Sequence, residues 1–508
     1  MFQRIRSAAL RGIEAIPVEI EVDSTSGLPG FSLVGLPDNA VREARERVIS
    51  AMRSCGFYGC STRMTVNMSP ADLRKEGAAF DLGLAIGILT ATEQIKVAGL
   101  ENFLFLGELS LDGRLRPVRG VLAIAAELAR SAPKTILVVP YENMEEAACV
   151  EVLKVIASKT LEECLNGLQK PELVYCSYLE CSSISATQNK IPDFSQVHGM
   201  ANVKRALEIS AAGAHNFLLV GSPGSGKTLC ARCLPGILPA MRKNESLEST
   251  IIHSCAGTFN FSEGLMKNRP FRSPHHTATV ASLVGGMRLR PGEASLAHNG
   301  VLFLDELPEF QRAALESLRQ PLEEGVIHLN RALGSISFPA NFVLGAAMNP
   351  CPCGYAMDKR RDCRCVPESI RRYRSKVSGP LLDRIDLQVA VPSVPIDENR
   401  LGVSEDSKDI QKRVEAACEI QEKRLKEMKN FRNGYLDGKI LKDILFWDAE
   451  TENFALKAAE KWRMSHRGYD RMLKVSRTIA DLRQSSKVER ADLAEAIQYR
   501  ALETAWID

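Results

Sequence analysis

No stretch of this 508-residue sequence approaches the roughly 18 consecutive apolar residues that a membrane-spanning helix requires. The first ten residues also lack the long apolar core and the following cleavage pattern of a secretory signal peptide. No internal repeat is visible. We therefore expect a soluble, cytoplasmic protein that has no membrane partner.

An excess of charge of one sign is also lacking. The 65 Lys and Arg residues nearly balance 62 Asp and Glu residues, and the resulting net charge of +3 says little about partners. Two basic runs lie within one short region and consist of Lys359, Arg360 and Arg361, followed by Arg371, Arg372 and Arg374. Two interpretations remain open for these runs, contact with phosphates and a solvated basic face.

Disulfide bonds are not expected either. The 14 cysteines occur in a long chain without a secretory signal, so reduced thiols or metal ligands are the better interpretation. The hydrophobic content of 45% is enough for packed cores, and the length predicts roughly three domains of about 150 residues each.

The pattern along the chain divides it into four parts. Residues 1–170 alternate β-rich runs with helical patterns, which predicts a compact α/β or α+β domain, and residues 171–194 lose this periodicity and are interpreted as a linker. Residues 195–394 form the third part. In residues 395–508 the segments 404–429 and 448–504 have a helical pattern, which predicts a helical lid.

Residues 216–228 are the most informative stretch, because an apolar strand leads directly into a G-x-x-x-x-G-K-T phosphate loop. The loop consists of Gly221, Ser222, Pro223, Gly224, Ser225, Gly226, Lys227 and Thr228. Its glycines let the backbone fold around a polyphosphate, Lys227 reaches the β- and γ-phosphates, and Thr228 holds Mg²⁺. This Walker A motif predicts that the ligand is a nucleoside triphosphate.

A second motif lies downstream, where the apolar run Val301–Leu304 is followed by Asp305 and Glu306. A strand that ends in two acidic residues is the Walker B pattern of nucleotide triphosphatases. A third apolar run at 342–347 precedes Asn349, which is either a polar contact to the γ-phosphate or an ordinary turn residue. Arg384 follows a short apolar segment, and Arg467 lies where a lid helix begins.

Taken in order, these pieces resemble an AAA+ ATPase of the magnesium-chelatase-like branch. The similarity includes FRSPHH at 271–276, the segment 285–300 before Walker B, and a hairpin pattern at 325–338. It implies that Asp305 holds Mg²⁺, Glu306 orients or activates the attacking water, and Asn349 is sensor 1. It also implies that Arg384 is an arginine finger acting in trans and that Arg467 is sensor 2, with Arg471 as a second candidate. A hexameric ring follows from the same resemblance.

Four cysteines follow Asn349 within fifteen positions and are Cys351, Cys353, Cys363 and Cys365. Zn²⁺ in a Cys₄ tetrahedron is the first interpretation, although C-x-C is tighter than the usual C-x-x-C. Reduced structural thiols and a redox pair remain alternatives. Cys230 and Cys233 have helical spacing and are interpreted as buried small residues.

The N-terminal part resembles the proteolytic domain of Lon proteases, an S5-like α/β fold, through residues 75–81 and 107–120. In that comparison Ala79 occupies the position of the nucleophilic serine and Ile124 that of the lysine base, so proteolysis is not expected. We interpret Asp81 and Lys75 as a structural ion pair. Taken with the segments 27–31 and 34–38, this N-terminal part completes a layout that resembles the YifB/ComM family over nearly the whole chain.

The resemblance implies a hexameric ATP-driven motor that acts on single-stranded or branched DNA and extends strand exchange by branch migration during natural transformation. Arg331, near the tip of the predicted hairpin, is the candidate DNA contact. Two alternatives remain: a chelatase-type subunit that remodels a protein partner for metal insertion, and a scaffold that binds nucleotide without turnover. The predicted fold is thus a multi-domain α/β protein with an S5-like N-domain, an AAA+ core and a helical lid.

Overall fold

The computed structural model describes residues 1–34, 39–59, 62–70, 77–169, 175–176, 191–261, 264–286, 290–331, 334–358, 360–392, 404–426 and 431–500. The chain forms two compact units. The first contains residues 1–186 together with residues 246–266, and the second contains residues 187–245 and 267–508. Most of the predicted linker, residues 35–38 of the YifB/ComM pattern and residues 75–76 of the Lon-like pattern lie outside the described residues.

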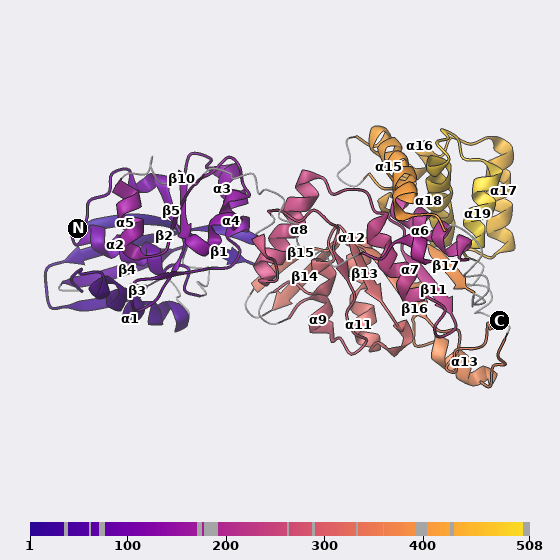
Figure 1. Ribbon diagram of the computed structural model, residues 1–508, viewed down its shortest axis with the longest axis horizontal. Helices are drawn as coiled ribbons and strands as arrows, with labels where there is room; N and C mark the ends of the chain where they lie inside the picture. Colours follow the sequence, from indigo (N-terminus) through magenta and orange to yellow (C-terminus); the bar gives the residue numbers. More distant parts are fainter. Residues whose placement is uncertain are drawn as a thin grey trace. The chain divides into compact units, whose positions relative to one another are not determined.

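The first unit is built on an eight-stranded mixed sheet with the order β10-β9-β8-β5-β1-β2-β4-β3 (Figure 1). Its strands are β1 (Phe2–Arg11), β2 (Glu14–Thr25), β3 (Gly30–Val34), β4 (Arg63–Ser69), β5 (Phe103–Phe105), β8 (Ile136–Pro140), β9 (Lys154–Ser158) and β10 (Tyr175–Cys176). Buried and exposed residues alternate along β2, where Val18, Ile20 and Val22 face the core. The sequence predicted that β-rich runs alternate with helical patterns in this part of the chain, and β2, β4 and β8 are strands of that kind.

Helix α2 (Asp81–Ala91) is buried along its whole length, as its uninterrupted apolar sequence requires. Gly83 and Gly87 let it approach the sheet closely, since a Cβ atom at Gly87 would lie 2.8 Å from Val22 Cγ2. The other helices of this part are α1 (Asn39–Ser54), α3 (Val121–Ser131), α4 (Met144–Ala148) and α5 (Leu161–Gln169), and a small hairpin pairs β6 (Glu108–Leu109) with β7 (Leu115–Arg116).

Asp81, at the start of α2, forms its ion pair with Arg47, whose Nε lies 2.8 Å from Asp81 Oδ2. Burial raises the pKa of Asp81 to about 6, and the bonds from Arg47 oppose this shift. Ile124 is buried in α3, so it packs in the core. The partner that we expected for Asp81, Lys75, is not among the described residues.

The second unit contains a five-stranded parallel sheet with the order β12-β13-β16-β11-β17. Its strands are β11 (Phe217–Gly221), β12 (Phe271–Arg272), β13 (Val301–Leu304), β16 (Val343–Met348) and β17 (Leu387–Val391). Strands β11, β13 and β16 are buried at every position, so they read as continuous apolar runs. The predicted hairpin is formed by β14 (Val326–Arg331) and β15 (Gly334–Pro339).

Helices lie between and after these strands in the sequence and continue to residue 498. They are α6 (Ala201–Gly213), α7 (Lys227–Cys233), α8 (Lys243–Ala256), α9 (Val280–Val284), α10 (Glu293–Leu296), α11 (Arg312–Ser317), α12 (Arg319–Glu324), α13 (Pro367–Arg374), α14 (Gly379–Leu382), α15 (Ser407–Arg424), α16 (Gly438–Ile444), α17 (Ala449–Lys461), α18 (His466–Leu482) and α19 (Arg490–Gln498). From Ser246 onward α8 belongs to the first unit, where Ser254 donates a hydrogen bond to Glu146.

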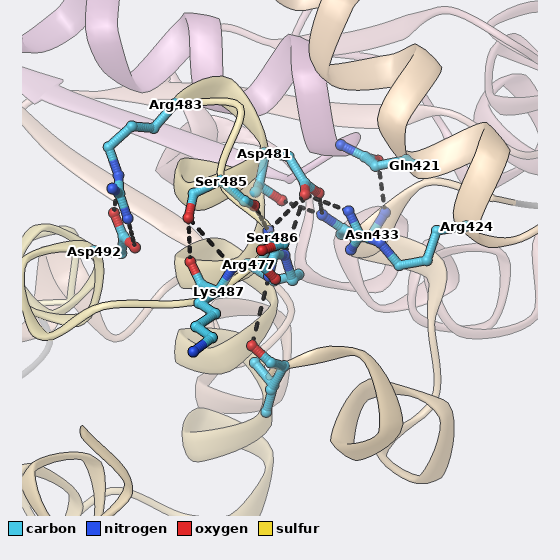
Figure 2. A network of polar contacts seen from close by, with 12 residues as sticks. Gln421, Arg424, Asn433, Arg477, Asp481, Arg483, Ser485, Ser486, Lys487 and Asp492 are labelled. Carbon is cyan, nitrogen blue, oxygen red and sulfur yellow. Dashed lines mark hydrogen bonds and ion pairs between the residues drawn. The ribbon is translucent and has the colours of Figure 1, made fainter. Parts of the chain in front are cut away.

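The helices after residue 404 are joined by a buried polar network around Asp481 on α18 (Figure 2). Arg477 Nη2 donates to Asp481 Oδ1 at 2.8 Å, and Asn433 Nδ2 donates to Asp481 Oδ2 at 2.8 Å. Arg424, from α15, forms a third bond to the same carboxylate. The network therefore ties α15, α18 and the segment between them together. Among the described residues, no helix is both long and apolar enough to cross a membrane.

Candidate nucleotide site

The predicted nucleotide residues meet at one edge of the parallel sheet. Strands β13 and β11 both pair with β16, so the three strands lie side by side. The Walker A loop follows β11, Asp305 follows β13, and Asn349 follows β16. Because the carboxyl ends of parallel strands lie at the same edge, this topology brings the three segments together at the usual ligand-binding position of such sheets.

The Walker A loop is shaped for an anion. Gly224 and Gly226 have φ values of +75° and +84°, which L side chains rarely adopt. Helix α7 begins directly after them, so its free N–H groups are at the loop. Among the described residues, the buried hydroxyl of Ser225 has no hydrogen-bond partner. An unsatisfied donor in this position fits a phosphate oxygen.

Lys227 connects the loop to sensor 1. Its Nζ donates to the carbonyl oxygens of Gly221 at 2.7 Å and Ser222 at 2.8 Å, and to Asn349 Oδ1 at 3.2 Å. Burial lowers the pKa of Lys227, while the charges of Asp305 and Glu306 oppose the shift. The structure thus brings Lys227 and Asn349 together, although 122 positions separate them.

Thr228 and Asp305, the two predicted Mg²⁺ ligands, are also in contact. The Thr228 hydroxyl donates to Asp305 Oδ2 at 2.6 Å. A hydroxyl and a carboxylate are oxygen ligands of the kind that Mg²⁺ prefers, together with water and phosphate oxygens. The residues present therefore fit an ATP·Mg²⁺ complex.

Glu306 has an unusual backbone. Its φ of +54° lies in the left-handed region, which is uncommon for glutamate and is a feature of functional sites. Its carboxylate lies 3.1 Å from His276 Nδ1. Sequence reasoning did not assign a role to His276. A signal was present, since FRSPHH begins on β12, the neighbour of β13, and so leads to the same sheet edge.

The predicted arginines lie elsewhere in the second unit. Arg384 donates to Glu323 Oε2 and Arg467 Nη2 lies 3.4 Å from Glu323 Oε1, so one carboxylate on α12 holds both side chains. Arg467 is the second residue of α18, which Ser465 caps. Arg471 Nη1 lies 3.6 Å from Asp386. Among the contacts of the described residues, Arg384 and Arg467 do not contact Lys227 or Glu306. Glu323 was not foreseen from the sequence.

The four cysteines after sensor 1 converge. The Sγ atom of Cys351 lies 3.3 Å from that of Cys353 and 3.6 Å from that of Cys363, and the four Sγ atoms all lie within 4.8 Å of one another. In a Zn–Cys₄ tetrahedron with bonds of about 2.3 Å the sulfurs are about 3.8 Å apart. The cluster fits one Zn²⁺.

Cys230 and Cys233, by contrast, are fully buried in the apolar core, as expected. Burial raises the pKa of their thiols to about 11 and about 12. The backbone of Arg331 ends β14 opposite Gly334, whereas its side chain and residues 332–333 lie outside the described part of the chain. Lys359 of the first basic run is likewise not described.

Comparisons with known proteins agree with this geometry. A family model described as "Magnesium chelatase, subunit ChlI" matches residues 193–399, one described as "Subunit ChlI of Mg-chelatase" matches residues 20–143, and one described as "Magnesium chelatase, subunit ChlI C-terminal" matches residues 404–500. A Lon protease 2 from Bacillus subtilis is 26% identical over 124 residues, covering 24% of this chain and 22% of its own length.

Several proteins are similar over almost the full length, and two of them are the following. The competence protein ComM of Haemophilus influenzae is 43% identical over 505 residues, covering 98% of this chain and 97% of its own. A protein named YifB from Escherichia coli is 39% identical over 508 residues, with coverages of 98% and 97%. With the Walker residues assembled at the sheet edge, this similarity shows that the chain belongs to the ComM/YifB family of magnesium-chelatase-like AAA+ proteins.

Proposed function

We propose that this protein is an ATP-hydrolysing, ring-forming motor that acts on single-stranded or branched DNA. The observation that carries the ATPase part is the joint placement of Lys227 with Asn349 and of Thr228 with Asp305 at the edge of the parallel sheet. Phosphoryl transfer requires positioning and charge neutralisation more than covalent chemistry, and these side chains supply both.

In this proposal each residue has a defined task. The Walker A backbone and Lys227 bind the phosphates, and Asn349 holds Lys227 in register with the γ-phosphate. Mg²⁺, when bound, neutralises the charge that develops on the phosphate oxygens. Thr228 and Asp305 would hold it. Glu306 orients and deprotonates the attacking water, and His276 fixes the position of its carboxylate.

We further propose that the ring is a hexamer and that Arg384 completes the site of a neighbouring subunit, with Arg467 as sensor 2. One fact supports a role of Arg384 outside its own subunit. Among the described contacts, Arg384 binds Glu323 and Pro380 and none of the nucleotide residues of its own chain. An arginine finger accelerates phosphoryl transfer by about 10³- to 10⁵-fold, so the subunit alone is expected to hydrolyse ATP slowly.

The remaining parts follow the same family. We propose that residues 1–170 form an S5-like domain of the Lon type without proteolytic activity, since Ala79 and Ile124 stand where the serine and lysine are required. Residues 195–394 would be the ATPase core and residues 395–508 its helical lid. We assign one Zn²⁺ to the four clustered cysteines.

DNA is proposed as the substrate because one relative that is similar over almost the full length is named a competence protein, and because the resemblance found in the sequence implies a motor that acts on DNA. The function would then be helicase activity and branch migration during natural transformation. One observation favours a second candidate, since three family models carry the description of a magnesium chelatase subunit. In that case the motor would remodel a protein partner.

One measurement separates these functions. We expect ATP turnover by the full-length protein to rise several-fold when forked or single-stranded DNA is added, and we expect Glu306→Gln to abolish turnover in both conditions. Turnover that ignores DNA would favour the protein-remodelling motor. Binding of ATP without any turnover in the wild-type protein would leave only the scaffold.

A further inference from the structure

A cavity of about 440 Å³ opens beside the Walker A loop. Three separate segments of the chain line it. The first is the stretch before α6, with Val197 and Met200, and the second is the Walker A loop with the start of α7. The third lies between the two cysteine pairs and contributes Tyr355, Asp358, Arg360 and Arg361. The sequence left two interpretations open for the basic residues of this third segment, contact with phosphates and a solvated basic face.

The segment between the cysteine pairs, of which residues 354–358 and 360–362 are described and which we call the cysteine loop, rests directly on the Walker A loop. Gly354 is buried with a φ of +86°, and a Cβ atom there would lie 2.5 Å from Pro223 Cδ. Only glycine leaves room for this approach. A second link is polar, because the N–H of Arg360 and, to a smaller extent, the Ser222 hydroxyl lower the pKa of Asp358.

Two side chains of the cysteine loop form a unit at the cavity wall. Arg361 Nη1 donates to the Tyr355 hydroxyl at 2.9 Å, and the Arg361 guanidinium carbon lies 5.2 Å from the centre of the Tyr355 ring. The pair presents a positive charge and an aromatic ring to the same cavity that the phosphate loop borders. A planar guanidinium suits phosphate oxygens, and an aromatic ring suits a base or ribose.

The cysteines determine where this loop can lie. Cys351 and Cys353 stand immediately before it, Cys363 and Cys365 stand at its other end, and the four sulfurs converge. A metal bound there would close the loop at both ends and remove most of its conformational freedom. The first pair is also joined to the catalytic edge, because Asn349, two residues before Cys351, contacts Lys227.

We propose that the cysteine loop is a metal-held wall of the nucleotide pocket, in which Tyr355 and Arg361 bind the nucleoside triphosphate seated on the Walker A loop. The proposal rests on the ATP site of the proposed function. It adds Tyr355 and Arg361 as residues that bind the nucleotide, and it makes nucleotide affinity depend on the bound metal. Metal binding and nucleotide binding are then coupled. Coupling between two binding sites is reciprocal, so bound nucleotide must raise the affinity for the metal by the same factor by which the metal raises the affinity for the nucleotide.

The first test measures the affinity of the full-length protein for a fluorescent ATP analogue together with the zinc content. Arg361→Ala is expected to weaken binding about tenfold, the range of one lost charged contact, while zinc stays at one equivalent. Arg364→Ala is the matched control, because Arg364 is exposed between Cys363 and Cys365 and is not among the cavity-lining residues. Equal affinities of Arg361→Ala and wild type would overturn the role of Arg361.

The second test measures the coupling itself. Zinc release from the wild-type protein to a chelator is followed with a metal-sensitive dye, with and without ATP, and the stripped protein is then titrated with the ATP analogue. We expect slower release with ATP and at least fivefold weaker binding after stripping. Cys363→Ser should bind ATP as weakly as the stripped protein. Unchanged release and unchanged affinity, or zinc far below one equivalent in untagged protein, would overturn the metal-held wall.

Lys227→Ala separates these failures from failure of the ATP site. If Lys227→Ala loses the ATP analogue while Arg361→Ala and stripped protein keep it, the nucleotide site stands and the cysteine loop has no part in it. If the wild-type protein does not bind the analogue, the proposed function fails, and the proposal that depends on it fails with it.

Discussion

Lys227 donates to three oxygen atoms, one for each of its ammonium hydrogens. Two of these acceptors are backbone carbonyls of its own loop, so phosphate oxygens must replace them when a nucleotide binds. The third, Asn349, belongs to another strand. Lys227 is therefore held close to the position in which it would bind phosphate. The two hydrogen bonds to carbonyl oxygens that it would lose on nucleotide binding can be replaced by bonds to phosphate oxygens.

Lys227→Ala and Glu306→Gln should separate binding from hydrolysis. Removal of the ammonium charge should weaken ATP binding by about 100-fold or more, because a charge-assisted contact to two phosphates is lost. Glu306→Gln should retain affinity within about twofold and lower turnover at least about 100-fold, because only water activation is removed. Equilibrium binding and steady-state turnover measure the two effects. Normal turnover in Glu306→Gln would show that Glu306 is not the base.

Asp481 is a residue whose importance is structural. Its carboxylate is fully buried and faces Arg477, which is 1% exposed, and Arg424 (Figure 2). Asp481→Ala leaves these guanidinium groups buried without a counter-charge, so we expect a loss of about 3–5 kcal/mol in the stability of the second unit. Denaturant unfolding of the full chain measures it. Asp409→Ala, which breaks an exposed pair with Lys412, should cost less than about 1 kcal/mol. Equal effects of the two variants would contradict this account.

At the scale of elements, three helices meet at one carboxylate. Glu323 lies at the end of α12, Arg384 follows α14, and Arg467 begins α18. Arg384 is only 7% exposed on its side chain, whereas Glu323 is 53% exposed. If Arg384 acts on a neighbouring subunit, it must first break its ion pair with Glu323. Glu323 and the neighbouring nucleotide site would therefore compete for the Arg384 side chain.

Arg384→Ala should lose hydrolysis and keep nucleotide affinity. Mixing it with Glu306→Gln protein should restore part of the activity, because some interfaces of a mixed ring then carry Glu306 from one subunit and Arg384 from the next. Turnover across mixing ratios measures the rescue. No rescue in rings shown to contain both subunits would mean that Arg384 does not act in trans.

Glu323→Gln extends the same reasoning. Without the competing carboxylate, Arg384 should reach the neighbouring site more readily, and turnover should rise about two- to fivefold, as expected for a partly exposed ion pair. The control is Glu324→Gln, since Glu324 is the next residue and lies with Gln320 and His328. Lower turnover in Glu323→Gln than in this control would instead assign Glu323 a role in positioning the arginines.

The elements show which parts of the site were predictable. Strand β13 has the predicted bounds, and β11 and β16 carry the Walker A loop and Asn349 at their ends, because continuous apolar runs mark buried parallel strands. Parallel order then brings their ends together. Glu323 and the contact of the cysteine loop with the Walker A loop were missed because these contacts join side chains far apart in sequence. Such contacts depend on how elements pack, and no local pattern encodes them. For His276 the FRSPHH motif gave a signal, but its contact with Glu306 follows only from the pairing of β12 with β13.

At the scale of the whole molecule, the two units are not consecutive in sequence. Residues 246–266 leave the second unit and complete the first, where Ser254 bonds to Glu146 and Gly120 packs close to Cys255. A fragment of residues 1–186 would lack this helix and expose Glu146, whose carboxylate is buried. Experiments on the N-terminal unit therefore require the full chain.

The proposed substrate also belongs to the scale of the whole molecule, because the channel of the proposed ring would exist only in the assembly. We propose that Arg331 lies in this channel, since β14 and β15 form a hairpin and Arg331 stands at the last register pair before its tip. A phosphate contact contributes charge and no sequence reading. Arg331→Ala should therefore weaken DNA binding about equally for unrelated sequences and reduce the salt slope of log affinity by about 1.

Basal turnover of ATP should survive in Arg331→Ala, because Arg331 lies outside the Walker motifs, whereas DNA stimulation and branch migration should fall. Lys423→Ala is the control, since it removes an equal charge from an exposed position on α15. The comparison of Arg331→Ala with Lys423→Ala is made by measuring DNA affinity at several salt concentrations. An unchanged DNA affinity and salt slope in Arg331→Ala would show that Arg331 does not contact DNA. If the wild-type protein also failed to respond to DNA, a protein partner would become the better candidate, because ATP hydrolysis would then act on another substrate.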